Sequence, residues 1–115
     1  MKIGIPVTGD RVSGPGEAME VVIVDTATGQ ELERYENPAL TATSARGIMM
    51  VRSVVDRGAE ALVVGGIGQH ALDYARQKLK VMGAVDMTVP EIVQTLNSGK
   101  LAELHHPNHQ GHHSH

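Results

Sequence analysis

The sequence predicts a single three-layer α/β domain, and three observations support this fold class. Apolar residues form short runs and longer helical patterns in the order strand, strand, strand, helix, strand, helix, strand, helix. The length of 115 residues and the apolar content of 41% suit one globular domain with its own core. Residues 61–72 follow the pattern buried strand, glycine-rich turn, amphipathic helix, which is typical of α/β folds.

The predicted strands differ in how they are connected. A short turn joins the second strand to the third, so these two are expected to form an antiparallel pair at one edge of the sheet. Helices precede the fourth and fifth strands, so the first, fourth and fifth strands are expected to be parallel. The five strands are expected at residues 2–7, 19–25, 31–37, 59–64 and 80–84.

Two helices are predicted from apolar residues that recur at intervals of three and four. The first is expected to start at an N-cap residue within 41–44, where threonine and serine occur, and to continue as far as Arg57. Gly58 then supplies the C-terminal stop. The second helix is expected over residues 69–79.

A third helix has the most complete start signal in the chain. Thr88 is a suitable N-cap, and Pro90 lies in the first turn. Glu91 occupies the position that completes a capping box. Apolar residues then continue at helical spacing until the stop at 97–99.

The composition excludes several classes of function. A formal net charge of −3 and an aromatic content of 2% argue against nucleic-acid binding. The absence of cysteine excludes disulfides, thiolate nucleophiles and cysteine-bound iron–sulfur clusters. No long apolar run or signal-peptide pattern is present, so we expect a cytoplasmic protein without membrane association. No spacing of residues supports a catalytic set, so we do not expect an enzyme.

The glycine-rich turn after the fourth predicted strand is the best candidate for a binding site. Its backbone N–H groups and the positive end of the following helix dipole are expected to face a ligand above the strand. The expected donors are the N–H groups of Gly65, Gly66, Ile67 and Gly68. The loop after the first strand reaches the same sheet edge, where ligands bind in open α/β sheets. The remaining residues expected at this anion site are Arg11, Gly14, Gly16, Arg46 and His70.

The same turn also matches a dinucleotide-binding fingerprint. Gly66, Gly68 and Ala71 fit the spacing G-x-G-x-x-G/A, and Asp86 follows at the distance expected for a ribose contact. In dinucleotide-binding folds this motif follows the first strand, whereas here it follows the fourth. A nucleotide-dependent enzyme or regulator is therefore the alternative to a protein that binds another anion.

Histidines are concentrated at the C-terminal end of the chain. Neutral imidazoles bind zinc, copper and nickel, so this end could act as a metallochaperone by itself. We expect one domain over residues 1–104 and a flexible histidine-rich tail over residues 105–115. The expected metal ligands are His105, His106, His109, His112, His113 and His115.

Four motifs of the chain, taken together, are typical of one protein family. They are Lys2-Ile3-Gly4-Ile5-Pro6-Val7, Glu36-Asn37-Pro38, Val64-Gly65-Gly66-Ile67-Gly68 with Ala71, and Thr88-Val89 leading to Gly99-Lys100-Leu101. With these motifs the chain resembles the dinitrogenase iron–molybdenum cofactor biosynthesis family from Lys2 to about Leu104. The resemblance implies a ribonuclease H-like α/β/α fold with a mixed five-stranded sheet.

The resemblance also implies a function. Members of the family bind, store or deliver an anionic molybdenum-containing metal–sulfur cluster without catalysis, and cofactor-assembly or acceptor proteins are the implied partners. Many relatives carry His-Phe-Gly in the loop after the first strand, where this chain has Gly14-Pro15-Gly16. Without that histidine, a molybdenum–copper sulfide that brings its own sulfide ligands is favoured over an iron–molybdenum cluster.

Overall fold

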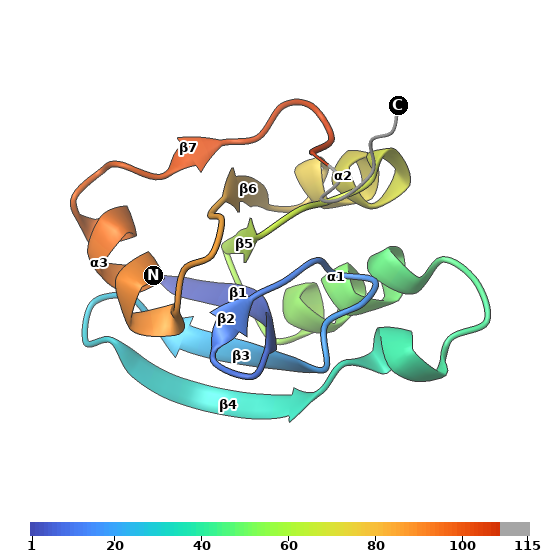
Figure 1. Cartoon of the computed structure of the whole chain (residues 1–115), viewed down its shortest axis with the longest axis horizontal. Coiled ribbons are helices and arrows are strands. Elements are labelled where there is room, and N and C mark those ends of the chain that lie inside the picture. The colour runs from blue at the N-terminus through green and yellow to red at the C-terminus, as the bar shows by residue number, and fades with distance from the viewer. Residues whose placement is uncertain (109–115) are drawn as a thin grey trace.

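The computed structural model describes residues 1–108 and confirms a three-layer α/β/α domain (Figure 1). A mixed sheet forms the middle layer with the strand order β4-β3-β1-β5-β6-β7, and β2 pairs with β1. The strands are β1 (Lys2–Thr8), β2 (Arg11–Val12), β3 (Glu20–Asp25), β4 (Gln30–Glu36), β5 (Ala61–Val64), β6 (Lys80–Gly83) and β7 (Ala102–Glu103).

Strand β1 lies in the interior of the sheet and separates its antiparallel part from its parallel part. On one side β1 is antiparallel to β3, and β3 is antiparallel to the edge strand β4. On the other side β1 is parallel to β5, and β5 is parallel to β6. The predicted edge pair and the three parallel strands are therefore confirmed. The carboxyl ends of the parallel strands meet at one edge of the sheet, which positions the site described below.

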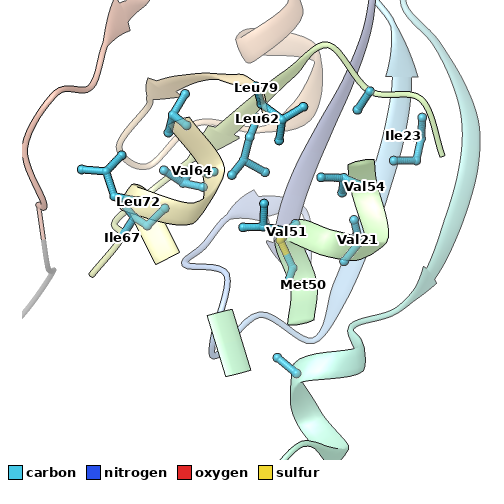
Figure 2. Close-up of a cluster of buried hydrophobic side chains, with 14 residues drawn as sticks. Val21, Ile23, Met50, Val51, Val54, Leu62, Val64, Ile67, Leu72 and Leu79 are labelled. Atoms are coloured by element: carbon cyan, nitrogen blue, oxygen red, sulfur yellow. The ribbon is translucent and has the colours of Figure 1, made fainter. Parts of the chain in front are cut away.

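Three helices cover the two faces of the sheet within residues 1–108 (Figure 1). Helices α1 (Arg46–Asp56) and α2 (Gln69–Arg76) lie on one face, and α3 (Val89–Asn97) lies on the other. Each face has its own apolar core, which explains why the strands between them are buried on both sides. Figure 2 shows the core on the α1 and α2 face, where Met50 and Leu72 lie in one buried cluster with Leu62 of β5. No helix in this described part is long and apolar enough to cross a membrane.

The structure differs from the prediction at the ends of several elements. The predicted loop over residues 11–17 begins with a short strand, β2, because Val12 pairs with β1. The segment before α1 forms a 3₁₀-helix, η1 (Pro38–Thr41), which Asn37 caps. Helix α1 starts after Ala45 and not after a hydroxyl residue. Helix α2 ends at Arg76, three residues before the predicted end, because Gln77 already takes the C-cap position.

Residues 101–108 form a C-terminal strap that runs antiparallel alongside β6 and ends beside α2 (red in Figure 1). Its strand β7 adds an antiparallel edge to the five predicted strands. The Leu104 N–H donates to the Val81 carbonyl at 2.8 Å, and the Leu104 side chain packs over Gly83, where a Cβ atom would lie 3.1 Å away. The Asn108 N–H donates to the Ile67 carbonyl at 3.0 Å. These contacts continue past the predicted domain boundary at Leu104.

Candidate functional site

The glycine loop, Gly65–Gly68, joins the buried end of β5 to the start of α2. Two of its four N–H groups are bonded within the protein: Gly65 donates to the Ser13 carbonyl at 2.9 Å, and Ile67 donates to Asn108 Oδ1 at 3.0 Å. The N–H groups of Gly66 and Gly68 have no partner among residues 1–108. We expected all four to be ligand donors, so the structure reduces that set to two.

The start of α2 adds further N–H groups beside the loop. Gly68 is the N-cap residue in an extended conformation, and no side chain caps the helix. The first intrahelical bond runs from Leu72 N–H to the Gly68 carbonyl at 3.0 Å. The N–H groups of residues 69–71 therefore have no carbonyl partner earlier in the chain, as at any helix N-terminus. They give this end of α2 a partial positive charge.

The start of α1 reaches the same place. It has no side-chain cap either, and its N-cap residue, Ala45, has a left-handed backbone with φ 52°. Such a conformation costs on the order of 1 kcal/mol for a residue with a Cβ atom. Gly47 in the first turn lets the two helices approach, because a Cβ atom there would lie 3.0 Å from the Cβ of Ala71. Two uncapped helix N-termini are thus brought together.

A cleft of about 380 Å³ lies between these two helix ends and the loop after β1. The positive ends of two helix dipoles and the unpartnered N–H groups make it suited to an anion. One lining carboxylate, Glu17, opposes an anion, so the helix side of the cleft is the favourable side. The lining residues are Pro15, Gly16, Glu17, Gly47, Gly66, Ile67, Gly68, Gln69, His70 and Ala71.

Asn37 holds the wall that faces the helix ends, which we call the facing loop (residues 14–18). Its side-chain amide donates to the carbonyls of Pro15 and Ala18, both at 2.9 Å. Its Oδ1 accepts from the Ala39 N–H at 3.0 Å, and the side chain is almost fully buried. The Asn-Pro corner named in the sequence therefore has a structural role: it ties the facing loop to η1.

A second, smaller cleft of about 150 Å³ is lined by Gly65 and Gly66 and shares Gly66 and Glu17 with the larger one. It is lined by Gly14 and by two carboxylates, Glu17 and Asp86, so its charge is opposite to that of the helix ends. Asp86 has a left-handed backbone with φ 58°. Ala45 and Asp86 are the positive-φ residues other than glycine among residues 1–108; Ala45 precedes α1, and Asp86 lines the smaller cleft with Gly65 and Gly66. Strained backbone of this kind is frequent at functional sites.

Of the other residues predicted for the anion site, three line a cleft and two, Arg46 and Arg11, do not. His70 and Gly16 line the larger cleft, and Gly14 lines the smaller one. Arg46 is exposed at the start of α1, and its Cβ would lie 3.9 Å from a Cβ atom at Gly16. Arg11 lines neither cleft, and its exposed guanidinium donates to the Asp86 carbonyl at 2.6 Å.

The predicted metal ligands of the tail are only partly described. His105 lies against α2, where its carbonyl and Nδ1 are 3.3 and 3.4 Å from the Arg76 guanidinium. His106 is exposed. No group of three or more histidine and carboxylate side chains among residues 1–108 could hold a metal ion. The other predicted ligands, His109, His112, His113 and His115, lie outside the described residues.

The sequence did not single out Gly47, Glu17 or Asn108 as site residues. Gly47 looked like an ordinary residue of a helix, and Glu17 like a loop charge. The one available signal was Gly47 itself. Glycine within a helix lowers the stability of that helix, so its presence in the first turn of α1 can indicate a close approach of another element. No local signal identified Asn108, which lies 41 residues from its partner.

The chain is thus a small three-layer α/β/α domain with a cleft at the ends of its parallel strands, lined in part by backbone N–H groups. The chain belongs to the family described as dinitrogenase iron–molybdenum cofactor, whose model matches residues 1–99. This membership associates the chain with metal-containing cofactors. The resemblance inferred from the four sequence motifs is thereby confirmed.

Solved structures share the fold over almost the whole chain. The apo form of the orange protein from Desulfovibrio gigas is 27% identical with a TM-score of 0.84, covering 94% of this chain and 96% of that one. A NifB-like protein from Thermotoga is 28% identical with a TM-score of 0.76, covering 96% and 98%. A Methanocaldococcus jannaschii protein, described as a dinitrogenase, is 17% identical with a TM-score of 0.70 over 93% and 97%, which shows the fold alone. No curated protein sequence matches the chain.

Proposed function

We propose that the protein binds an anionic molybdenum-containing metal–sulfur cluster in the larger cleft and stores or delivers it without catalysis. The observation that carries this proposal is the convergence of two uncapped helix N-termini on one cleft beside the unpartnered N–H groups of Gly66 and Gly68. The family description supplies the class of ligand. Cofactor-assembly or acceptor proteins in the cytoplasm are the proposed partners.

The chemistry of the cleft favours a ligand with its own metal ligands. The lining contains no thiolate and a single imidazole, that of His70, so it offers N–H donors and dipoles in place of a coordination sphere. A sulfide-bridged polyanion needs this kind of host, since N–H groups donate to its sulfur atoms and the helix dipoles balance its charge. A molybdenum–copper sulfide therefore fits better than an iron–molybdenum cluster that requires protein ligands.

The experiment is reconstitution with tetrathiomolybdate and a copper salt, followed by desalting and visible absorption spectroscopy. We expect charge-transfer bands to elute with the wild-type protein. Gly16→Val is the test variant, because a Cβ atom at Gly16 makes an ordinary contact of 3.7 Å with the Gly47 nitrogen and adds bulk over the α1 terminus. It should fold normally and retain less than about a tenth of the cluster, the effect of losing roughly 1.4 kcal/mol of binding.

Ala27→Val is the matched control. Ala27 lies in the exposed turn between β3 and β4, so the valine adds the same kind of bulk far from the cleft. It should retain the cluster at the wild-type level. Equal retention by the Gly16→Val variant would place the ligand elsewhere. Loss of all copper or zinc binding on deletion of residues 109–115, which leaves the Asn108 contact with Ile67 in place, would favour the alternative of a tail metallochaperone with zinc, copper or nickel.

The nucleotide alternative keeps one structural observation in its favour. Asp86 follows β6 and lines the smaller cleft beside Gly65 and Gly66, as an acidic ribose ligand does in a βαβ unit. The melting temperature separates the alternatives. Stabilisation by NAD or ATP but not by tetrathiomolybdate would favour the nucleotide, whereas the reverse result is expected.

A further inference from the structure

Asn108, at the end of the C-terminal strap, bonds both backbone polar groups of Ile67. Its Oδ1 accepts from the Ile67 N–H at 3.0 Å, and its own N–H donates to the Ile67 carbonyl at 3.0 Å. The strap reaches this position through β7, the Leu104 contact with Gly83 and the Arg76 contact with the His105 carbonyl. A segment predicted to be a flexible tail thus contacts the predicted binding loop directly.

The glycine loop needs such an anchor because three of its four residues are glycine. Glycine has more backbone freedom than any other residue, so an unanchored loop would present its N–H groups in many directions. The Gly65 N–H and the Gly68 carbonyl are bonded at the two ends of the loop. Ile67 is held by its buried side chain, seen in Figure 2, and by Asn108.

We propose that Asn108 is a positioning residue for the anion cleft. Its bond to the Ile67 carbonyl holds the peptide unit that carries the Gly68 N–H, and its bond to the Ile67 N–H holds the peptide unit that joins Gly66 to Ile67. Gly66 and Gly68 both line the cleft. A host whose donors are already oriented avoids the entropy cost of ordering them when the ligand binds. The inference rests on the proposed function, because it assigns a role in binding the same ligand.

Isothermal titration calorimetry with tetrathiomolybdate on the full-length protein tests whether Asn108 contributes to ligand affinity. Asn108→Ala removes the acceptor of the Ile67 N–H and should weaken binding roughly three- to tenfold, the effect of one net hydrogen bond. Asn97→Ala is the matched control, because the Asn97 side chain likewise makes one hydrogen bond to the backbone, in this case as a donor to the Thr26 carbonyl at 2.9 Å. Its binding should be unchanged. Equal or tighter binding by Asn108→Ala would overturn the inference.

Amide hydrogen exchange in the ligand-free protein gives a second readout, which a general loss of stability does not reproduce. The Ile67 amide should lose protection in Asn108→Ala, while the Leu72 amide keeps it. Asn108→Asp retains an oxygen acceptor and should restore the protection of Ile67. Full protection in the alanine variant would contradict the proposed contact.

The outcomes separate this inference from the proposed function. If the wild-type protein does not bind tetrathiomolybdate, the proposed function fails and the role of Asn108 in it fails as well. If the wild-type protein binds and Asn108→Ala binds equally, the inference alone fails.

Discussion

The N-termini of α1 and α2 differ from that of α3 in how their first N–H groups are bonded. At α3, Thr88 Oγ1 accepts from the Glu91 N–H at 3.4 Å, and Glu91 Oε1 accepts from the Thr88 N–H at 2.8 Å. This is a complete capping box. Helices α1 and α2 begin at Ala45 and Gly68, and neither has a side-chain cap.

The difference follows the position of the cleft. A side-chain cap stabilises a helix by about 1 kcal/mol, so two missing caps lower the stability by about 1–2 kcal/mol. The chain omits caps at the two termini that reach the larger cleft and keeps one at the terminus that does not. Helix ends that give up stability where a ligand could bind are typical of a binding site.

Releasing the facing loop should have the largest effect on both stability and ligand binding. Asn37→Ala leaves two buried carbonyls and the Ala39 N–H without their partner, so the free energy of unfolding should fall by about 3 kcal/mol. Tetrathiomolybdate binding should be lost because the wall opposite the helix ends is no longer held. Urea denaturation and calorimetry measure the two effects.

Asn97→Ala serves as the control for this change, since it removes one partly buried hydrogen bond in place of three. We expect it to cost about 1 kcal/mol and to leave binding intact. If Asn37→Ala cost no more than Asn97→Ala, the proposed role of the Asn-Pro corner would be wrong.

Adding a side-chain cap to α2 should make its N-terminus resemble that of α3, with higher stability and weaker ligand binding. Gly68 has φ −84° and ψ 170°, an extended conformation that aspartate adopts readily at an N-cap. Gly68→Asp should stabilise the fold by about 0.5 kcal/mol, because the carboxylate caps the helix and interacts with its dipole. The same carboxylate would fill part of the proposed anion position and repel the negatively charged ligand. Tetrathiomolybdate binding should therefore weaken at least about tenfold.

Gly68→Asn is the companion variant, because it caps without a charge and separates the steric effect from the electrostatic one. Thermal unfolding and calorimetry on the same samples give both quantities. A rise in affinity for either variant would contradict the placement of the ligand at the start of α2.

Removing the cap of α3 should have the smallest effect and should leave binding unchanged. Thr88→Ala should lower the free energy of unfolding by about 1 kcal/mol, which corresponds to a fall in Tm of about 4–8 °C for a domain of this size. Calorimetry with tetrathiomolybdate should give the wild-type affinity. A change in affinity would mean that the two faces of the sheet are coupled.

The capping box also gives a pH test. The hydrogen bond from the Thr88 N–H, followed by that from its hydroxyl, holds the pKa of the Glu91 carboxyl below its usual value of 4.5. Because the pKa is lower in the folded state, this contribution to stability is present above the unfolded pKa and is lost as the pH falls through the folded pKa. Thermal unfolding of wild type and Glu91→Gln should therefore converge toward acid pH. A constant difference between them would contradict the role of the carboxylate.

Features that depend on residues close in sequence were predictable. The capping box of α3 involves Thr88 and Glu91, which lie three residues apart, so their spacing was sufficient. The stop of α1 at Gly58 was predictable for the same reason, because a left-handed residue is needed there and φ is 81°. The strand, turn and helix pattern over residues 61–72 also depends on local sequence alone.

Features that depend on distant contacts were not predictable. The start of α1 at Ala45 has no side-chain signal, and threonine and serine nearby were better N-cap candidates. Gly47 acquires its role only because Ala71, on another helix, lies against it. Two expected donors, Gly65 and Ile67, already have partners at Ser13 and Asn108, which no spacing could reveal.

The dominance of main-chain donors in the larger cleft has a consequence for how the site can evolve and respond to its surroundings. Every residue except proline carries the same N–H group, so substitutions that preserve the backbone preserve the donors. The fold that positions these donors is shared with structures at 27–28% identity. Peptide N–H groups also do not titrate near neutral pH, so these main-chain donors remain the same across the neutral range.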